Sequence, residues 1–150
     1  MKIIETTVYT FNELSDSAKE KAREWYREGM YDYGWWNYTY EDAERIGLKI
    51  ESFDIYRHEI SGKLTDTVNG VCERIIKEHG EDCSTYTLAK TIDLRKDNDD
   101  DFTVCEFNRS LLKVYLRILR EESEYMESNE AVDENILANE YTFTESGKRF

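Results

Sequence analysis

Hydrophobic residues recur every three to four positions along much of the chain, with charged residues between them. Apolar side chains at this period fall on one side of a helix. In the longest such stretch, residues 102–128, they occupy two adjoining faces that include Leu111 and Leu112. A stripe of that width predicts a central helix that is buried on both sides. The period predicts helices at residues 16–31, 37–46, 64–79, 102–128 and 129–139.

Branched and aromatic side chains alternate with other residues in three further stretches, which predicts strands at residues 2–11, 49–56 and 141–144. The tripeptide Tyr-Thr-Phe occurs in both the first and the last of these strands, so we expect the two ends of the chain to meet in one sheet. Residues 84–95 fit a short helix and an extended segment equally well. Together these elements predict a mainly helical α+β fold, with a small antiparallel sheet formed by N-terminal, middle and C-terminal strands.

The chain has 150 residues, a length that fits a single domain spanning residues 1–150. Hydrophobic residues make up 39% of it and aromatic residues 13%, which is too much apolar area for a disordered acidic tail. No run approaches the roughly 18 apolar residues needed to cross a bilayer. Residues 1–5 also lack the apolar core of a secretion signal. We therefore expect a folded cytoplasmic protein that does not bind membranes.

The chain carries 33 acidic and 20 basic residues, for a formal net charge of -13. Phosphates would be repelled, so we expect no direct binding of nucleic acid and instead a partner with a basic surface. Between Arg120 and Lys148 there is no Lys or Arg at all. The first acidic segment lies in this stretch and consists of Glu121, Glu122, Glu124, Glu127, Glu130, Asp133 and Glu134. The second acidic segment consists of Asp97, Asp99, Asp100 and Asp101.

Two interpretations of the acidic segments remain open. Carboxylates held on a helix can present a row of charges like that of a nucleic-acid backbone, so the segments could occupy a basic DNA- or RNA-binding groove. They could equally form an ordinary solvated helix face and a charged loop. A calcium loop beginning at Asp97 is disfavoured, because Phe102 stands where such a loop requires glycine and Asn108 where it requires glutamate.

The sequence offers no catalytic or metal-binding motif. Cys72, Cys83, Cys105 and His79 lack the two-residue spacing of a zinc knuckle, and the simplest expectation for the cysteines is reduced thiols. No Gly-x-Ser-x-Gly elbow or glycine-rich phosphate loop occurs. We expect His58 and His79 to be exposed polar residues. The sequence therefore predicts a protein without enzymatic activity, catalytic residues, metal or cofactor.

Residues 31–40 contain six aromatic side chains, which could fill the core between two helices or form a binding face. The second possibility gives an alternative function, in which an antitoxin-like protein binds a toxin through an aromatic face. That face would consist of Trp25, Tyr33, Trp35, Trp36 and Tyr38.

Two blocks of the sequence resemble a family of small acidic phage and prophage proteins, some of which are labelled antitoxin-like. The first block runs from Thr7 to Gly29 and continues in Trp35-Trp36 and Tyr40-Glu41-Asp42; the second comprises residues 124–134, 138–144 and 147–150. They cover about half of the chain, while residues 48–100 depart from the family pattern. The resemblance brings no catalytic residues with it. Combined with the acidic segments, it implies an inhibitor of a host nucleic-acid-binding defence effector of the CRISPR or restriction type, acting by nucleic-acid mimicry in the host cytoplasm.

Overall fold

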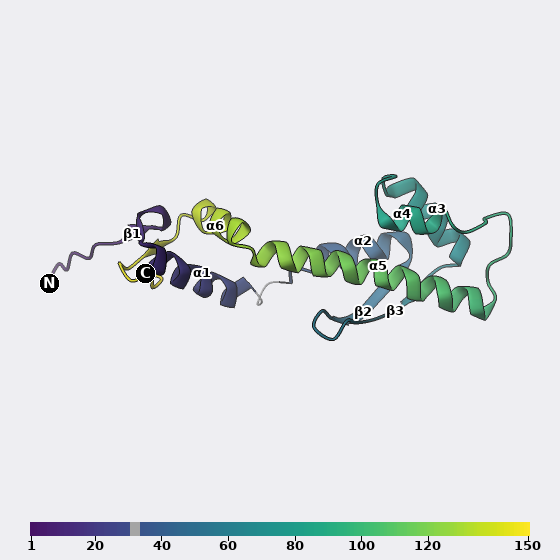
Figure 1. Ribbon diagram of the computed structural model, residues 1–150, viewed down its shortest axis with the longest axis horizontal. Coiled ribbons are helices and arrows are strands. Elements are labelled where there is room, and N and C mark those ends of the chain that lie inside the picture. The colour runs from purple at the N-terminus through teal and green to yellow at the C-terminus, as the bar shows by residue number, and fades with distance from the viewer. Residues whose placement is uncertain (31–33) are drawn as a thin grey trace. The chain divides into compact units, whose positions relative to one another are not determined.

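The computed structural model describes residues 1–30 and 34–150 (Figure 1). Helices make up 56% of the described residues and the strands among them form small antiparallel sheets, so the mainly helical α+β prediction is confirmed. The elements in chain order are β1 (Tyr9–Thr10), the short 3-10 helix η1 (Phe11–Glu13), α1 (Asp16–Met30), α2 (Asn37–Ile46), β2 (Leu48–Asp54), β3 (Glu59–Leu64), α3 (Val68–Glu78), α4 (Ser84–Ala89), α5 (Asp101–Glu127), α6 (Asn129–Ala138) and β4 (Thr142–Phe143).

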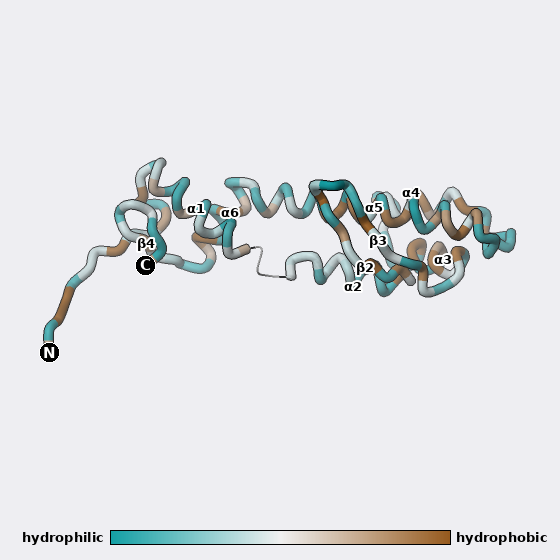
Figure 2. The backbone as a smooth tube through the Cα atoms, turned by 90° about the horizontal axis from the view of Figure 1, so that it is seen from below, coloured by the Kyte–Doolittle hydropathy of each residue, from teal (hydrophilic) through white to brown (hydrophobic). Residues whose placement is uncertain are grey.

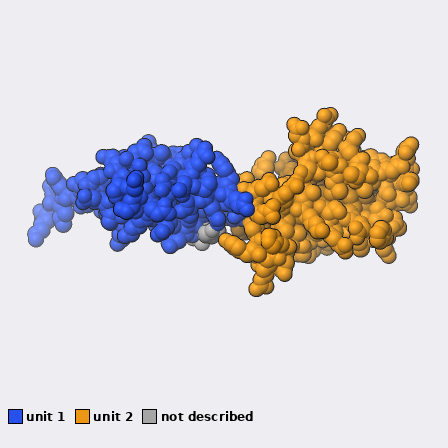
Figure 3. Space-filling model, in the orientation of Figure 1, with its two compact units in different colours: residues 1–35, 123–150 blue, residues 36–122 orange. Residues whose placement is uncertain are grey.

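The chain divides into two compact units, which Figure 3 colours separately. Unit 1 contains residues 1–35 and 123–150, and so joins the two ends of the chain. Unit 2 contains residues 36–122. The division falls within α5, after Glu122. The expectation of a single domain over residues 1–150 stays a prediction.

In unit 1, β1 and β4 pair antiparallel with Tyr9 opposite Phe143, which confirms that the two Tyr-Thr-Phe segments bring the chain ends into one sheet. Phe143 is fully buried among α1, α6 and η1 side chains that include Ala22 and Val132. Gly147 closes the C-terminal turn with a φ of +90°, and a Cβ there would collide with the backbone oxygen of Ala18. Glycine is therefore required for the C-terminal turn to approach α1 this closely.

The N-terminal strand is much shorter than its sequence pattern predicts. Only Tyr9–Thr10 is a strand, whereas residues 1–8 are non-helical, unpaired and largely exposed. A strand needs a neighbour for its backbone hydrogen bonds, and β4, the neighbour of β1, is itself only two residues long. The branched residues before Tyr9 therefore have no partner strand, and the strand ends where its pairing with β4 ends.

In unit 2, β2 and β3 form a second antiparallel sheet, which corrects our prediction that the middle strand joins the terminal strands. β2 instead pairs with the next segment of the chain, from Leu48 opposite Leu64 to Asp54 opposite Glu59. A hairpin of this kind needs only a short connection, which favours local pairing. Leu64, expected in a helix, ends β3, and α3 begins four residues later behind Thr67, whose hydroxyl accepts a hydrogen bond from the Gly70 amide at 3.0 Å.

The core of unit 2 lies where α3 and α5 meet the neighbouring elements. Val71, Ile75, Leu111 and Tyr115 have no exposed area, and Leu112 beside them is also buried. The buried pair at positions 111 and 112 shows that the middle of α5 is covered on two adjoining faces, whereas Phe102 and Tyr125 at its two ends are 76% and 55% exposed, so the helix is not buried along its whole length. Figure 2 shows the hydrophobic positions of α3 and α5 as brown stretches interrupted by hydrophilic ones. The ambiguous stretch at residues 84–95 begins with the short helix α4, after which the chain is irregular.

Across residues 1–30 and 34–150, no helix has both the length and the apolar character needed to cross a lipid bilayer.

Candidate interaction surface

The first acidic segment begins in the last turns of α5 and ends in α6. Ser128 separates the two helices and caps α6, because its hydroxyl oxygen accepts a hydrogen bond from the Ala131 amide at 3.2 Å. Glu121 and Glu122 belong to unit 2, and the other five members of the segment belong to unit 1. Each unit therefore holds its own part of the acidic segment.

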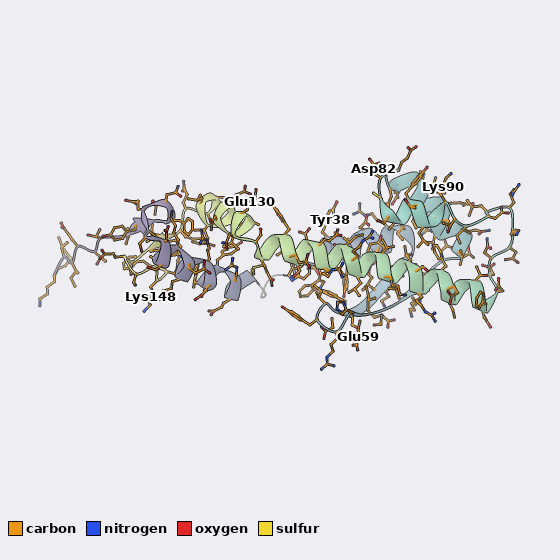
Figure 4. All side chains as sticks on the ribbon, viewed as in Figure 1. Tyr38, Glu59, Asp82, Lys90, Glu130 and Lys148 are labelled. Atoms are coloured by element: carbon orange, nitrogen blue, oxygen red, sulfur yellow. The ribbon has the colours of Figure 1, made fainter. Side chains whose placement is uncertain are left out.

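The part of the segment on α6 has two outward-facing carboxylates. Asp133 and Glu134 follow Glu130 by three and four residues, so the three side chains lie on one side of the helix. Glu130 and Glu134 are exposed, and neither forms an ion pair among the described residues. Figure 4 labels Glu130 on α6. These two side chains are available to a partner.

Asp133, between them, is already bound within unit 1. Its two carboxylate oxygens accept hydrogen bonds from Nε and a terminal nitrogen of Arg23 at 2.7 and 2.9 Å. Both side chains are mostly covered, with 18% of Arg23 and 27% of Asp133 exposed. The hydrogen bond to Asp133 raises the pKa of the Arg23 guanidinium above its ordinary value. Asp133 thus fastens α6 to α1 and is not an outward-facing charge.

A second arginine of α1 binds the junction between α5 and α6. Arg27 donates a hydrogen bond to the backbone oxygen of Glu127 at 3.0 Å and another to the side-chain oxygen of Asn129. A cation at this position is favoured by the partial negative charge at the C-terminal end of α5. Nearby, Glu124 is exposed and Glu127 is half-buried. The basic residues of α1 therefore balance part of the acidic segment from within unit 1.

The acidic residues of unit 2 include several with local structural roles. Glu121 lies 3.9 Å from Arg117, one turn earlier on α5, while Glu122 is exposed and has no ion pair within the described ranges. In the second acidic segment, Asp100 accepts hydrogen bonds from the amide and hydroxyl of Thr103 at 3.0 and 2.9 Å, which lower its pKa. Asp100 therefore caps the start of α5.

The remaining members of the second acidic segment are exposed. Asp97, Asp99 and Asp101 all reach solvent, and Asp101 lies in the first turn of α5, where a negative charge is favourable. No group of three or more His, Cys, Asp or Glu side chains in residues 1–30 and 34–150 is arranged to hold a metal ion. Cys83 and Cys105 are exposed free thiols, and burial raises the pKa of the Cys72 thiol to about 11.

The proposed aromatic face is divided between the two units. Trp25 belongs to unit 1, where its ring makes edge contacts with Tyr141 at 5.1 Å and Phe143 at 5.9 Å between centroids. Trp36 belongs to unit 2 and contacts Phe53 at 6.1 Å. These contacts are typical of core packing. The other members are Trp35, half-buried in unit 1, Tyr38, 74% exposed in unit 2, and Tyr33, which lies outside the described residues.

His79 corrects the expectation that both histidines are exposed. His58 is exposed in the β2–β3 turn, but only 10% of the His79 side chain is accessible. Its Nε2 lies 3.2 Å from a carboxylate oxygen of Asp42, and its Nδ1 lies 2.5 Å from the Thr85 hydroxyl. The Tyr115 hydroxyl donates to the other oxygen of Asp42 at 3.0 Å. The four residues Asp42, His79, Thr85 and Tyr115, which we term the Asp42 network, connect α2, α4 and α5 with the end of α3.

The Asp42 network supplies hydrogen-bond partners for the buried Thr85 and Tyr115 side chains and for the mostly buried His79, while 32% of the Asp42 side chain is exposed. The hydrogen bond from His79 lowers the pKa of the Asp42 carboxyl, and burial raises the pKa of Tyr115. One signal in the sequence points to it: Asp42 stands beside Ala43 and four residues before Ile46, on the apolar side of α2. His79 carries no such signal, because it follows the last turn of α3 and meets Asp42 only in the folded chain.

Three members of the Asp42 network, Asp42, His79 and Thr85, also line a cavity of about 340 Å³ in unit 2. Both nitrogens of His79 and both oxygens of Asp42 are engaged in the network. The arrangement therefore supports the packing of unit 2, and the candidate for partner binding remains the outward face of α6.

Comparisons with protein-family models, curated proteins and solved structures find no match to this chain.

Proposed function

We propose that this chain is a phage-encoded acidic protein that inhibits a host nucleic-acid-binding defence effector, of the CRISPR or restriction type. It acts in the host cytoplasm by occupying a basic groove in place of nucleic acid. The observation that supports this proposal is the pair of exposed carboxylates on α6, Glu130 and Glu134, neither of which forms an ion pair among the described residues. A formal net charge of -13 adds a long-range attraction to any basic surface.

The mechanism is electrostatic competition. A groove that binds nucleic acid presents Lys and Arg side chains at phosphate spacing, and carboxylates on a helix can satisfy the same groups. Complementary charge raises the rate of encounter and excludes partners of the wrong sign. Glu130 and Glu134 meet the groove, while Asp133 between them holds α6 on α1 and keeps the face rigid.

The test is a competition assay with labelled DNA bound to a panel of purified CRISPR and restriction effectors. We expect the protein to displace DNA from at least one of them and to lose potency as salt is raised, because exposed ion pairs are screened. The variant Glu130→Lys/Glu134→Lys should weaken displacement about tenfold or more, since charge reversal at an interface replaces attraction with repulsion.

The matched control is Glu24→Lys/Glu28→Lys on α1 of the same unit. It changes the net charge equally, at exposed positions with the same four-residue spacing. We expect its potency to stay within about twofold of the original. Equal losses in both variants would mean that only net charge matters, and unchanged potency of the α6 variant would reject this face. Failure to displace DNA from any effector would reject the proposed function.

A further inference from the structure

The N-terminal segment of unit 1, residues 1–8, is an unpaired continuation of β1. Ile3 and Ile4 are 84% and 83% exposed, and no strand pairs with the segment among the described residues. In Figure 1 it runs outward from β1 as an extended tail, and Figure 2 shows hydrophobic positions along this tail in brown. Unpaired N–H and C=O groups beside branched side chains are a template for pairing with another chain.

The sequence of this tail is complementary to itself in one antiparallel register. If Lys2 stands opposite Glu5 of a second copy, then Ile3 stands opposite Ile4 of that copy and Ile4 opposite Ile3. Opposite residues of an antiparallel pair point to the same side of the ribbon. The pairing therefore joins Lys to Glu at two places and Ile to Ile at two places.

Other alignments lose this match. A parallel, in-register pair places Lys2 on Lys2 and Glu5 on Glu5, and like charges directly opposite are destabilising. An antiparallel shift of two residues leaves Lys2 opposite Thr7 and Ile4 opposite Glu5. One register thus combines charge complementarity with burial of the two highly exposed isoleucines.

We propose that residues 2–5 form an interaction surface for a second copy of this chain, through antiparallel strand pairing in the Lys2–Glu5 register. The ribbon extends β1 beyond the end of β4 and gives the tail the neighbour that β4 is too short to provide. A two-stranded ribbon is only marginally stable by itself, and the net charge of the chain opposes association. The dimer is consequently weak and forms at high protein concentration.

The test measures the association of the full chain by sedimentation velocity over a wide concentration range. The unchanged protein should show a reversible monomer–dimer equilibrium. Lys2→Glu and Glu5→Lys should each weaken self-association about tenfold or more, because like charges then meet across the ribbon. An equimolar mixture of these two variants should associate again, since the two glutamates on one strand then meet the two lysines on the other.

Two more variants complete the design. Lys2→Glu/Glu5→Lys exchanges the charges and should associate like the original protein, because the pairing is restored. Lys21→Glu makes the same charge change as Lys2→Glu at an exposed position of α1 and should leave association within about twofold. A protein that is monomeric at all concentrations would overturn the proposal. A dimer that responds equally to Lys2→Glu and Lys21→Glu, or a mixture that fails to associate, would overturn it as well.

Discussion

The two units hold their buried polar groups by different means. Unit 1 uses a formal ion pair, Arg23 with Asp133, to connect helices from opposite ends of the chain. Unit 2 uses the Asp42 network, in which a tyrosine and a histidine share one carboxylate. The acidic residues of unit 1 therefore cannot all be counted as surface charge, because Asp133 is paired with Arg23 and connects α6 to α1.

The apolar cores of the two units also differ, because unit 1 buries fewer hydrophobic side chains than unit 2. The buried cluster of unit 2 includes Tyr115, Leu111, Val71 and other side chains from four helices and β2. That of unit 1 is smaller and consists of Phe11, Leu14, Ala18, Ala22, Val132, Ile136 and Phe143. A smaller core contributes less stability. The stability of unit 1 therefore depends more on the Arg23–Asp133 ion pair, and that of unit 2 more on the packing around the buried ring of Tyr115.

The largest expected loss of stability comes from removing the buried ring of Tyr115. Tyr115→Ala deletes a fully buried ring and leaves an Asp42 oxygen without its donor. We expect the free energy of unfolding to fall by about 3–5 kcal/mol. Tyr115→Phe, which keeps the ring, should cost about 1–3 kcal/mol through the lost hydrogen bond. Urea unfolding followed by circular dichroism measures both, and equal losses in the two variants would contradict the importance of the ring.

A smaller loss is expected from the ion pair of unit 1. Asp133→Asn removes the charge that Arg23 pairs with in a partly buried setting, and should lower the free energy of unfolding by about 1–3 kcal/mol. The matched variant Glu134→Gln, on the same helix but exposed, should change it by less than about 0.5 kcal/mol. The same unfolding experiment compares the two. If Glu134→Gln were the more damaging change, the assignment of Asp133 as the structural carboxylate would be wrong.

The main helices of both units could be predicted from the sequence, because each has an apolar stripe at helical period. The wide stripe around Leu111 and Leu112 even indicated that α5 is covered on two faces. β3 was missed, since its alternation is interrupted by Gly62 and its last residue, Leu64, also fits the helical pattern that follows. Local patterns specify such strands least, because the pairing partner and register decide whether they form.

The candidate site was only partly predictable for a related reason. The positions of the carboxylates on α5 and α6 follow from helical period, but their partners do not. Arg23 lies 110 residues before Asp133 in the chain, and His79 lies 37 residues after Asp42. Such pairs are made by tertiary packing, which no local spacing encodes. The sequence therefore located the negative charges without distinguishing the outward-facing carboxylates from the one that binds α1.

The smallest expected effect is a pH dependence of the stability of unit 2, which arises from the Asp42 carboxyl. The hydrogen bond from His79 holds the pKa of the Asp42 carboxyl below its ordinary value of about 3.9 in unfolded chains. The folded protein therefore binds this proton less readily than the unfolded chain does. The stability contributed by Asp42 is fully present above the unfolded pKa, from about pH 5 upward, and is lost as the pH falls through the folded pKa.

The variant Asp42→Asn isolates this contribution, because it has no titrating group at position 42. The gap in unfolding free energy between the variant and the original protein should narrow from about pH 5 to about pH 2. Comparing the two proteins at each pH removes the contribution of the other carboxylates, including Glu13 and Asp100, whose pKa values are also lowered. A gap that stays constant over this range would contradict the role of the Asp42 charge, and it would leave the packing around Tyr115 as the whole source of stability in the network.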